Sequence, residues 1–318
     1  MTPQEIVISL TKHIRDKVRP HLGRAQARRI TGTAASGDAT FAIDDVAEQA
    51  IVEFIEREKL SVAYYSEDKG LIEFGSSPEA VLVIDPIDGT RPALAGFEQC
   101  VVAVSWADYV PDVTMGDVRF ACIAELKRDD LFFAERGQGA TWWAACGERQ
   151  APALLPIEDP RFAPLSFELA GRPMEYLAPV LSGIVDPAGI PAGCFLFNSS
   201  AYSLTRLLTG QLAAALDVGQ RILREVPKSR ERFVEIGGGT PIGIFTYDIA
   251  AAALIAEEAG AVVTDACGIS FKGTRLLDTS ESNLQSLCAA SNPRLHERLL
   301  STIQAGMGRL AECNKICD

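Results

Sequence analysis

Histidine and long apolar runs are both scarce in this sequence of 318 residues. The three histidines, His13, His21 and His296, lie outside every motif described below, so catalysis by histidine is not expected. No apolar run reaches the length that crosses a bilayer, so a membrane partner is not expected either. Residues 1–5 lack the basic and apolar regions of a signal peptide, which indicates a cytoplasmic protein.

Positive charge is also in short supply. The 42 acidic residues outnumber the 30 lysines and arginines, which gives a net charge of −12. A broad basic surface for nucleic acid is therefore not expected. One local basic patch, formed by Arg24, Arg28 and Arg29, fits a solvated helix face, with a partner site as the alternative. The eight cysteines form no zinc-type C-x-x-C pair, and we interpret them as the reduced thiols of a cytoplasmic protein.

The chain has enough apolar sequence for a large core, since 47% of its residues are hydrophobic. Successive strand-like runs between residues 62 and 143 indicate an antiparallel sheet. Strands and helices alternate beyond residue 160. The proline-rich stretch at residues 151–160 marks the expected boundary. We therefore predict an N-terminal α+β domain at residues 1–155 and a C-terminal α/β domain at residues 156–318.

The most informative stretch is VLVIDPIDGT at residues 81–90. Its first four residues are apolar and three of them are β-branched, which predicts a buried strand. Pro86 restricts the backbone and Gly89 permits conformations that other residues resist, so a stiff turn is expected to hold Asp85 and Asp88. Mg²⁺ prefers anionic oxygens of this kind. The stretch thus predicts a metal site, with a helix-capping turn as the alternative.

Three more acids, Asp44, Glu67 and Asp248, stand at the ends of predicted elements. Asp44 lies at the start of a helix, where Asp45 and Glu48 fit a capping box. Glu67 follows a short strand, and Asp248 begins an alanine-rich helix. A helix N-terminus favours an ionised carboxylate, so capping is the alternative to a functional role for Asp44 and Asp248. Glu67 alone could be a surface residue.

Taken together, Glu67, DPIDGT at residues 85–90, YDIAAA at residues 247–252 and EAG at residues 258–260 resemble the three signature motifs of the inositol monophosphatase superfamily. Their order and approximate spacing match, and the resemblance covers residues 5–305. It implies a layered αβαβα sandwich of the α+β or α/β class. It also implies a Mg²⁺-dependent, lithium-sensitive enzyme that hydrolyses a phosphate monoester of inositol or a sugar. Relatives are often homodimers, so a homodimer is expected.

The resemblance assigns roles to individual residues. Two to three Mg²⁺ ions would be held by four side chains and one backbone carbonyl, from Glu67, Asp85, Ile87, Asp88 and Asp248. Asp44 and Thr90, which pair in the family, would help to remove a proton from the attacking water, with Glu67 completing the catalytic set. The small-molecule phosphate ester would contact Asp88, Gly89, Thr90, Ser199, Ser200 and Asp217. Such chemistry needs metal ions because a phosphate monoester repels hydroxide.

Several positions depart from the family pattern and leave the identity of the ester open. Arg91 stands where common members have a small or polar residue. Thr33 replaces a lysine found in many members, in a stretch at residues 31–38 that has the composition of a flexible loop. Tyr247 replaces a tryptophan, and residues 198–200 read Asn-Ser-Ser instead of Gly-Thr-Ala.

Residues 220–239 form an insertion relative to compact members, and we expect a mobile or ligand-covering loop. Its four arginines could clamp a second phosphate, which gives a fructose-1,6-bisphosphatase or a nucleotide bisphosphate phosphatase as the alternative function. These are Arg221, Arg224, Arg230 and Arg232. A solvated charged loop is the simpler interpretation. An alternative of another class is a non-catalytic family member that binds a protein or RNA through residues 24–29.

Overall fold

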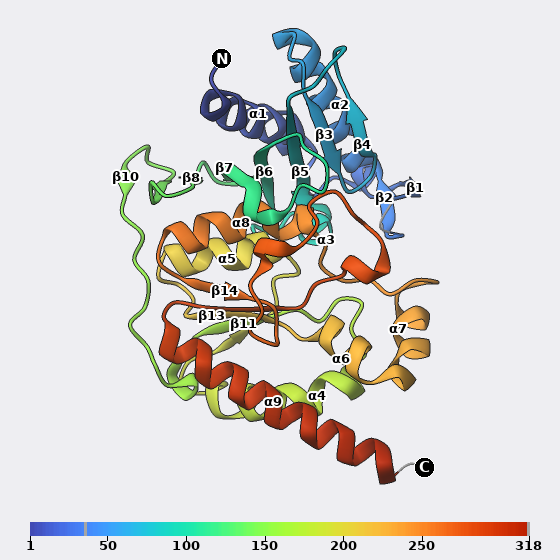
Figure 1. Cartoon of the computed structure of the whole chain (residues 1–318), viewed down its shortest axis with the longest axis vertical. Coiled ribbons are helices and arrows are strands. Elements are labelled where there is room, and N and C mark those ends of the chain that lie inside the picture. Colours follow the sequence, from blue (N-terminus) through green and yellow to red (C-terminus); the bar gives the residue numbers. More distant parts are fainter. Residues whose placement is uncertain (35–36, 317–318) are drawn as a thin grey trace.

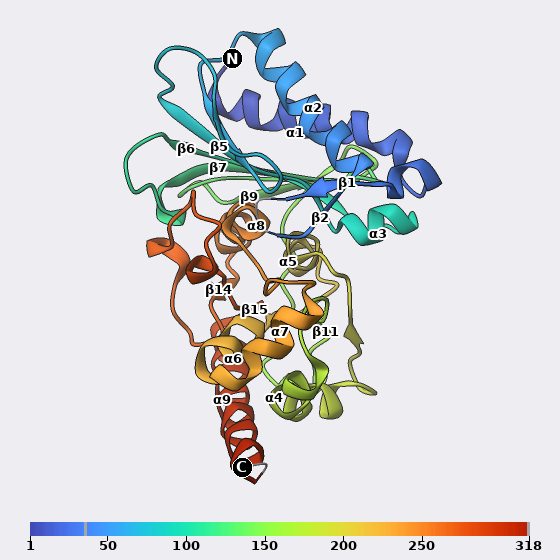
Figure 2. The same ribbon diagram turned by 90° about the vertical axis from the view of Figure 1, so that its right-hand side faces the viewer.

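The computed structural model describes residues 1–34 and 37–316. In this part of the chain, helices and sheets alternate in five layers, α–β–α–β–α, as Figures 1 and 2 show. The predicted layered αβαβα class is confirmed. No helix among these residues is long and apolar enough to cross a membrane.

Helices α1 (Pro3–Val18) and α2 (Ala42–Glu58) form the first layer. Thr2 caps α1, since its Oγ1 accepts from the Glu5 amide at 3.3 Å while Glu5 accepts from the Thr2 amide at 2.8 Å. The apolar side chains of both helices recur every three or four residues, so one face of each is buried against the large sheet. A short hairpin of β1 (Ile30–Thr33) and β2 (Ala39–Phe41) precedes α2. Residues 35–36 of the predicted flexible loop lie outside the described residues.

The large sheet has eight strands in the order β10-β9-β8-β7-β6-β5-β3-β4. Their bounds are β3 (Ala63–Ser66), β4 (Gly70–Glu73), β5 (Ala80–Asp88), β6 (Val101–Asp108), β7 (Val118–Glu125), β8 (Leu131–Glu135), β9 (Ala140–Trp143) and β10 (Arg149–Gln150). The pairing is antiparallel, as predicted, except that β3 and β5 run parallel. Parallel strands end at the same edge of a sheet, so the residues that follow β3 and β5 meet there.

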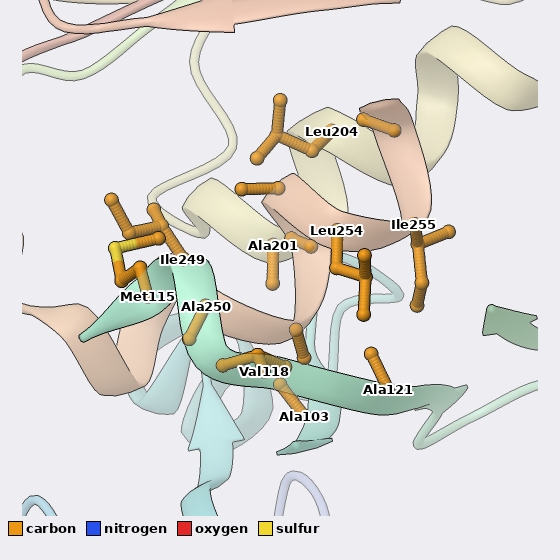
Figure 3. Close-up of a cluster of buried hydrophobic side chains, with 14 of the residues drawn as sticks. Ala103, Met115, Val118, Ala121, Ala201, Leu204, Ile249, Ala250, Leu254 and Ile255 are labelled. Atoms are coloured by element: carbon orange, nitrogen blue, oxygen red, sulfur yellow. The ribbon is translucent and has the colours of Figure 1, made fainter. Parts of the chain in front are cut away.

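Helices α5 (Ser200–Leu208) and α8 (Thr246–Glu258) form the middle layer. Both are almost entirely buried, because a sheet covers them on each side (Figure 2). Figure 3 shows Ala201 of α5 and Ala250 and Leu254 of α8 over Val118 and Ala121 of β7. The alanines let α8 approach the strands closely. The helix is thus fixed from both sides, and its N-terminus has one position relative to β5.

The small sheet has five strands in the order β12-β11-β13-β15-β14. Their bounds are β11 (Leu165–Phe167), β12 (Cys194–Phe195), β13 (Ala214–Asp217), β14 (Val262–Thr264) and β15 (Leu287–Ala290). Its outer face is covered by α4 (Met174–Ala188), α6 (Gly219–Glu225) and α9 (Pro293–Ile316). The chain passes from the large to the small sheet within residues 151–164, which include the predicted boundary. Two domains, at residues 1–155 and 156–318, stay a prediction.

The expected mobile loop at residues 220–239 is wrong. The segment forms α6, a 3₁₀ turn at Pro227–Ser229 and α7 (Arg230–Ile236). Ile222, Val226 and Phe233 are buried in the core beneath the small sheet. These three apolar side chains fix the insertion to the protein, and its basic residues point outward or into ion pairs.

The capping box predicted for Asp45 and Glu48 is also wrong. Helix α2 begins at Ala42, and Asp44 caps it by accepting from the Phe41 amide at 2.7 Å. Glu48 is buried instead and accepts a hydrogen bond from Ser66 Oγ at 2.5 Å. Burial raises the pKa of Glu48 to about 7, although the Ser66 hydrogen bond opposes that rise.

Candidate metal and phosphate site

The acidic motif at residues 85–90 lies at the end of β5, beside β3. Asp85 and Asp88 still belong to the strand, and its pairing with β6 is irregular between them. The predicted turn is wrong in detail, because the carboxylates lie on a bulged strand end and the turn follows them at Gly89. Gly89 has a φ of 91°, and an added Cβ would lie 2.4 Å from the Gln99 carbonyl oxygen. Only glycine fits this position.

Glu67 reaches the same edge of the large sheet from β3. The parallel register pairs Ser66 with Ile84, so Glu67 and Asp85 follow at adjacent strand ends. Glu67 is part-buried and its pKa is raised well above the usual range, first by burial and then by the charge of Asp248. Glu67 and residues 85–88 therefore lie at the same edge of the large sheet, and their joint role as metal ligands stays a prediction.

Asp248 comes from the other half of the chain, in the first turn of α8. It caps that helix by accepting from the Phe245 amide at 2.6 Å. Because α8 lies between the sheets, its N-terminus faces the end of β5. Carboxylate oxygens of Asp85, Asp88 and Asp248 lie within 4.8 Å of one another. Asp248 thus caps its helix and also belongs to the carboxylate cluster, so the two interpretations of this residue are compatible.

The three aspartates and Glu67 line a cavity of about 290 Å³. Gly89, Thr90, Ser199 and Ser200 line it as well, as does Ile87. This volume is at the lower end of the range for small-molecule sites. The cavity therefore suits a compact polar ligand and one or more ions.

Negative charge in the cavity is not balanced by the protein. Burial is the first cause that raises the pKa of Asp88 to about 6 and the pKa values of Asp85 and Asp248 well above their usual range. The charge of Asp88 adds to the rise for Asp85 and Asp248, whereas hydrogen bonds from Ser199 and from backbone amides oppose the rise for Asp88. Among the described residues that line the cavity, the only cationic ones are Arg91 and Arg172. Each already binds another acid. A hard divalent cation with oxygen ligands would supply the missing charge, so these donors fit such an ion.

This electrostatic arrangement predicts how the stability of the metal-free protein depends on pH. Asp88 keeps its proton up to a pH of about 6 in the folded state, whereas an unfolded aspartate loses it near 4. The folded state therefore holds more protons in between, so stability falls as pH rises through this window. We expect the free energy of unfolding in EDTA to drop by on the order of 3 kcal/mol from pH 4.5 to 7. Mg²⁺ should reverse the loss.

The measurement is urea denaturation at a series of pH values, with EDTA or with Mg²⁺. Asp88→Asn should flatten the pH dependence in EDTA, because it removes one of the groups whose charging opposes folding. A free energy of unfolding that rises from pH 4.5 to 7 in EDTA would contradict this account of the cluster.

Asp44 and Thr90, predicted as a catalytic pair, make separate hydrogen bonds. Thr90 Oγ1 donates to the Ile87 carbonyl oxygen at 3.1 Å, whereas Asp44 accepts from Phe41. Thr90 lines the cavity, whereas Asp44 is buried and does not line it. Burial raises the pKa of Asp44 to about 7. Their joint role stays a prediction.

Ser199 and Ser200 enter the site at the N-terminus of α5. The Ser199 hydroxyl donates to Asp88 Oδ2 at 2.8 Å, and the Ala201 amide donates to the same oxygen at 2.5 Å. Asn198, just before them, has a φ of 54°, the left-handed conformation that asparagine tolerates. The start of α5 therefore holds Asp88 in place from the side opposite β5.

Asp217 does not line the cavity, so its predicted contact with the substrate has no support in this geometry. It is buried at the end of β13, where Arg172 binds both of its carboxylate oxygens and the Gly219 amide donates to it at 2.7 Å. Arg172 also donates to the Ala170 carbonyl oxygen. The guanidinium group thus lies between Asp217 and the cavity, and Arg172 lines the cavity instead.

Sequence reasoning missed Arg172 and Glu168. Glu168 directly follows β11, is buried and lines the cavity. Burial raises its pKa to about 8, while Arg172 works in the opposite direction. The signal for Glu168 was present, because an acid after an apolar strand is the pattern that singled out Glu67. No comparable signal marks Arg172.

The four arginines of the insertion do not clamp a ligand at this site. None of them lines the cavity, and each binds a residue elsewhere. Their partners are Glu225, Ala266 and Gln304 for Arg221, Cys267 for Arg224, Glu281 for Arg230, and Glu175 and Glu235 for Arg232. The predicted second-phosphate clamp is therefore wrong, because none of these four guanidinium groups reaches the cavity.

Comparison with known proteins gives the wider context for this site. The model of the inositol monophosphatase family matches residues 4–307. A fructose-1,6-bisphosphatase/inositol-1-monophosphatase from Methanothermobacter thermautotrophicus is 26% identical over 305 residues, covering 94% of this chain and 95% of that protein. A Nus factor SuhB from Vibrio cholerae is 26% identical over 274 residues, covering 86% and 85%. An inositol monophosphatase structure from Thermotoga maritima has a TM-score of 0.69 at 17% identity, over 98% of this chain and 100% of that one.

The chain belongs to the inositol monophosphatase family, because the family model matches nearly its whole length. The similarity to the Thermotoga maritima structure, at so low an identity, supports the fold alone. The predicted family and the predicted enzyme class, a phosphatase, are confirmed.

Proposed function

We propose that the chain is a Mg²⁺-dependent phosphatase that releases phosphate from a phosphate monoester of inositol or a sugar. The observation that carries this proposal is the convergence of Asp85, Asp88 and Asp248 on one cavity, with Glu67 beside them. Their uncompensated charge calls for divalent cations, and the small cavity suits a compact ester. The relative from Methanothermobacter thermautotrophicus bears the names of both a bisphosphatase and a monophosphatase.

Two to three Mg²⁺ ions would be held by Glu67, Asp85, the Ile87 carbonyl group, Asp88 and Asp248. Bound there, such ions neutralise the phosphate and make water more acidic. The remaining work falls to residues of the chain. We assign the binding of phosphate oxygens to the backbone N–H groups of Gly89 and Thr90, and the orientation of the alcohol to Ser199 and Ser200.

Asp44 is the proposed proton acceptor for the attacking water, with the Thr90 hydroxyl as the group that relays the proton. A base with a pKa near 7 suits this task at neutral pH. Thr90 would have to leave the Ile87 carbonyl oxygen, which the same reaction needs for metal binding.

The test is phosphate release from a panel of esters, with and without Mg²⁺. The panel contains inositol 1-phosphate, sugar monophosphates, fructose 1,6-bisphosphate and a nucleotide bisphosphate. We expect turnover of at least one ester that disappears in EDTA. Asp44→Asn should lower kcat about 100-fold and remove the acidic limb of the pH profile near pH 7, whereas Asp45→Asn, on the exposed side of the same helix, should change little. Turnover that persists without any divalent ion would refute the proposal.

We also propose that the protein is a cytoplasmic homodimer. The six cysteines whose side chains the structure describes are all free thiols, which supports a reducing compartment. The dimer is implied by the family resemblance, and light scattering during gel filtration should give twice the mass of the chain. A mass of one chain at micromolar concentration would contradict it.

A non-catalytic role through the basic residues 24–29 has less support. All the predicted metal ligands are present and line one cavity, together with the carbonyl-bearing residue Ile87. Arg28 is engaged structurally, since its Nε donates to the Leu94 carbonyl oxygen at 3.1 Å. Binding of RNA or a protein with no phosphate release from any ester would favour that alternative.

A further inference from the structure

Arg91, the residue where the motif departs from the family pattern, lines the cavity directly after Thr90. Its guanidinium group donates two hydrogen bonds to the carboxylate of Asp38, at 2.8 and 2.7 Å. Asp38 lines the same cavity, immediately before β2. About half of the Arg91 side chain is exposed, at 51%, against 21% for Asp38. The pair therefore lies on the solvent side of the cavity.

The two arginines that line the cavity differ in how firmly they are held. Arg172 is 7% exposed, and its donors are used by Asp217 and Ala170. Breaking a buried pair costs several kcal/mol, so Arg172 is fixed. An exposed ion pair contributes only about 0–1 kcal/mol, so Arg91 can exchange Asp38 for another anion at low cost. Arg91 is thus the exchangeable positive charge of the cavity.

The surroundings of Arg91 indicate which part of a substrate it can meet. The hydrogen bond to Asp38 raises the pKa of Arg91, and the charges of Glu67 and Asp44 add to that rise. Arg91 also directly follows Gly89 and Thr90 along the wall of the cavity, and the backbone N–H groups of those two residues are assigned above to the phosphate oxygens. The group within its reach is therefore the phosphoryl group. A guanidinium fork binds two phosphate oxygens in the same geometry as two carboxylate oxygens.

We propose that Arg91 binds the non-bridging oxygens of the substrate phosphoryl group and of product phosphate, and that Asp38 is its intramolecular competitor. Without phosphate, the Asp38 carboxylate occupies the donors of Arg91, and phosphate displaces it. The proposal rests on the phosphatase function proposed above. The apparent association constant for phosphate is then the intrinsic constant multiplied by the fraction of molecules in which Arg91 is free of Asp38.

The two halves of the pair should respond to mutation with opposite sign. Arg91→Gln removes the phosphate contact and should weaken binding of inorganic phosphate about tenfold, the range for a charged hydrogen bond that is partly screened. Asp38→Asn removes the competitor and should tighten phosphate binding about threefold or more. In the double variant, Asp38→Asn should have no further effect, because the group it frees is missing.

The experiment measures inorganic phosphate binding by calorimetry at saturating Mg²⁺, and product inhibition by phosphate in the turnover assay. Arg119→Gln and Asp108→Asn are the matched controls, since this exposed pair joins neighbouring strands at 3.4 Å and neither residue lines the cavity. Both controls should leave phosphate affinity unchanged. The Mg²⁺ midpoint is recorded for every variant, so that a change in metal binding is not mistaken for one in phosphate binding.

Equal weakening by Arg91→Gln and Asp38→Asn would show that the pair only holds the structure together and would overturn the proposal. No change in either variant would overturn it too, as would a tightening in Asp38→Asn that follows a shifted Mg²⁺ midpoint. A wild-type protein that releases no phosphate from any ester would instead refute the phosphatase function itself. The two failures are thus distinguishable.

Discussion

We expect Asp88→Asn to reduce the proposed Mg²⁺-dependent phosphate release by at least about 1,000-fold, while the protein remains folded. Asp88 is held by both halves of the chain, because it belongs to β5 and accepts hydrogen bonds from Ser199 and Ala201 at the N-terminus of α5. An amide of the same shape keeps part of these contacts but removes a negative charge and a ligand oxygen for the cation. Removing one well-placed electrostatic partner commonly costs 100- to 1,000-fold in rate, and loss of metal binding adds to that.

The measurement is kcat/KM in a colorimetric phosphate assay, together with the Mg²⁺ concentration at half-maximal rate. Asp265→Asn is a matched control, because Asp265 is a buried aspartate that accepts backbone hydrogen bonds from Cys267 and Ile269 at 2.8 and 2.7 Å. It does not line the cavity, so it should retain most of the activity. An Asp88→Asn enzyme with near-normal turnover would remove the residue from the mechanism.

We expect Arg172→Met to destabilise the protein by about 3–5 kcal/mol at neutral pH, because it leaves Asp217 buried and without its cationic partner. Asp217 is 1% exposed, and without the guanidinium group it keeps the hydrogen bond from the Gly219 amide but has no cation beside it. Methionine fills much of the volume of the arginine stem, so the loss is chiefly electrostatic. Urea denaturation measures the change.

A second substitution separates charge from packing. Arg172→Met with Asp217→Asn should recover most of the lost stability, since the uncompensated charge is gone. Arg161→Met is the control, because its pair with Asp159 is exposed and should contribute less than about 1 kcal/mol. If Arg172→Met lowers the free energy of unfolding no more than Arg161→Met does, the buried pair of Arg172 and Asp217 does not stabilise this wall of the cavity.

Much of the site is predictable from the sequence because its residues sit at the ends of regular elements. Asp85 and Asp88 lie at the end of a strand whose first five residues are all apolar, and Asp248 lies in the first turn of a helix that is apolar on all sides. Buried elements of this kind can only end at the surface or at a cavity. Acidic residues at several such ends are therefore expected to lie at one cavity, and the resemblance to the family motifs indicates which of them meet there.

Other features depend on contacts that local sequence does not encode. The pair of Arg172 with Asp217 joins positions 45 residues apart, and nothing in either local sequence identifies the partner. Helices α6 and α7 have seven residues each, too short to show a helical repeat. Their charged composition conceals the few apolar residues, Ile222 and Phe233 among them, that bury the insertion.

Helix α8 affects the geometry of the acidic cluster through its position between the two sheets as well as through Asp248. It is the spacer between the two sheets, and Asp248 at its first turn faces Asp85 on a strand of only one of them. The thickness of the interior layer therefore sets the distance between Asp248 and Asp85. Enlarging Ala250, which is buried and does not line the cavity, should increase that distance, so the proposed cation affinity should depend partly on side-chain volume within this layer.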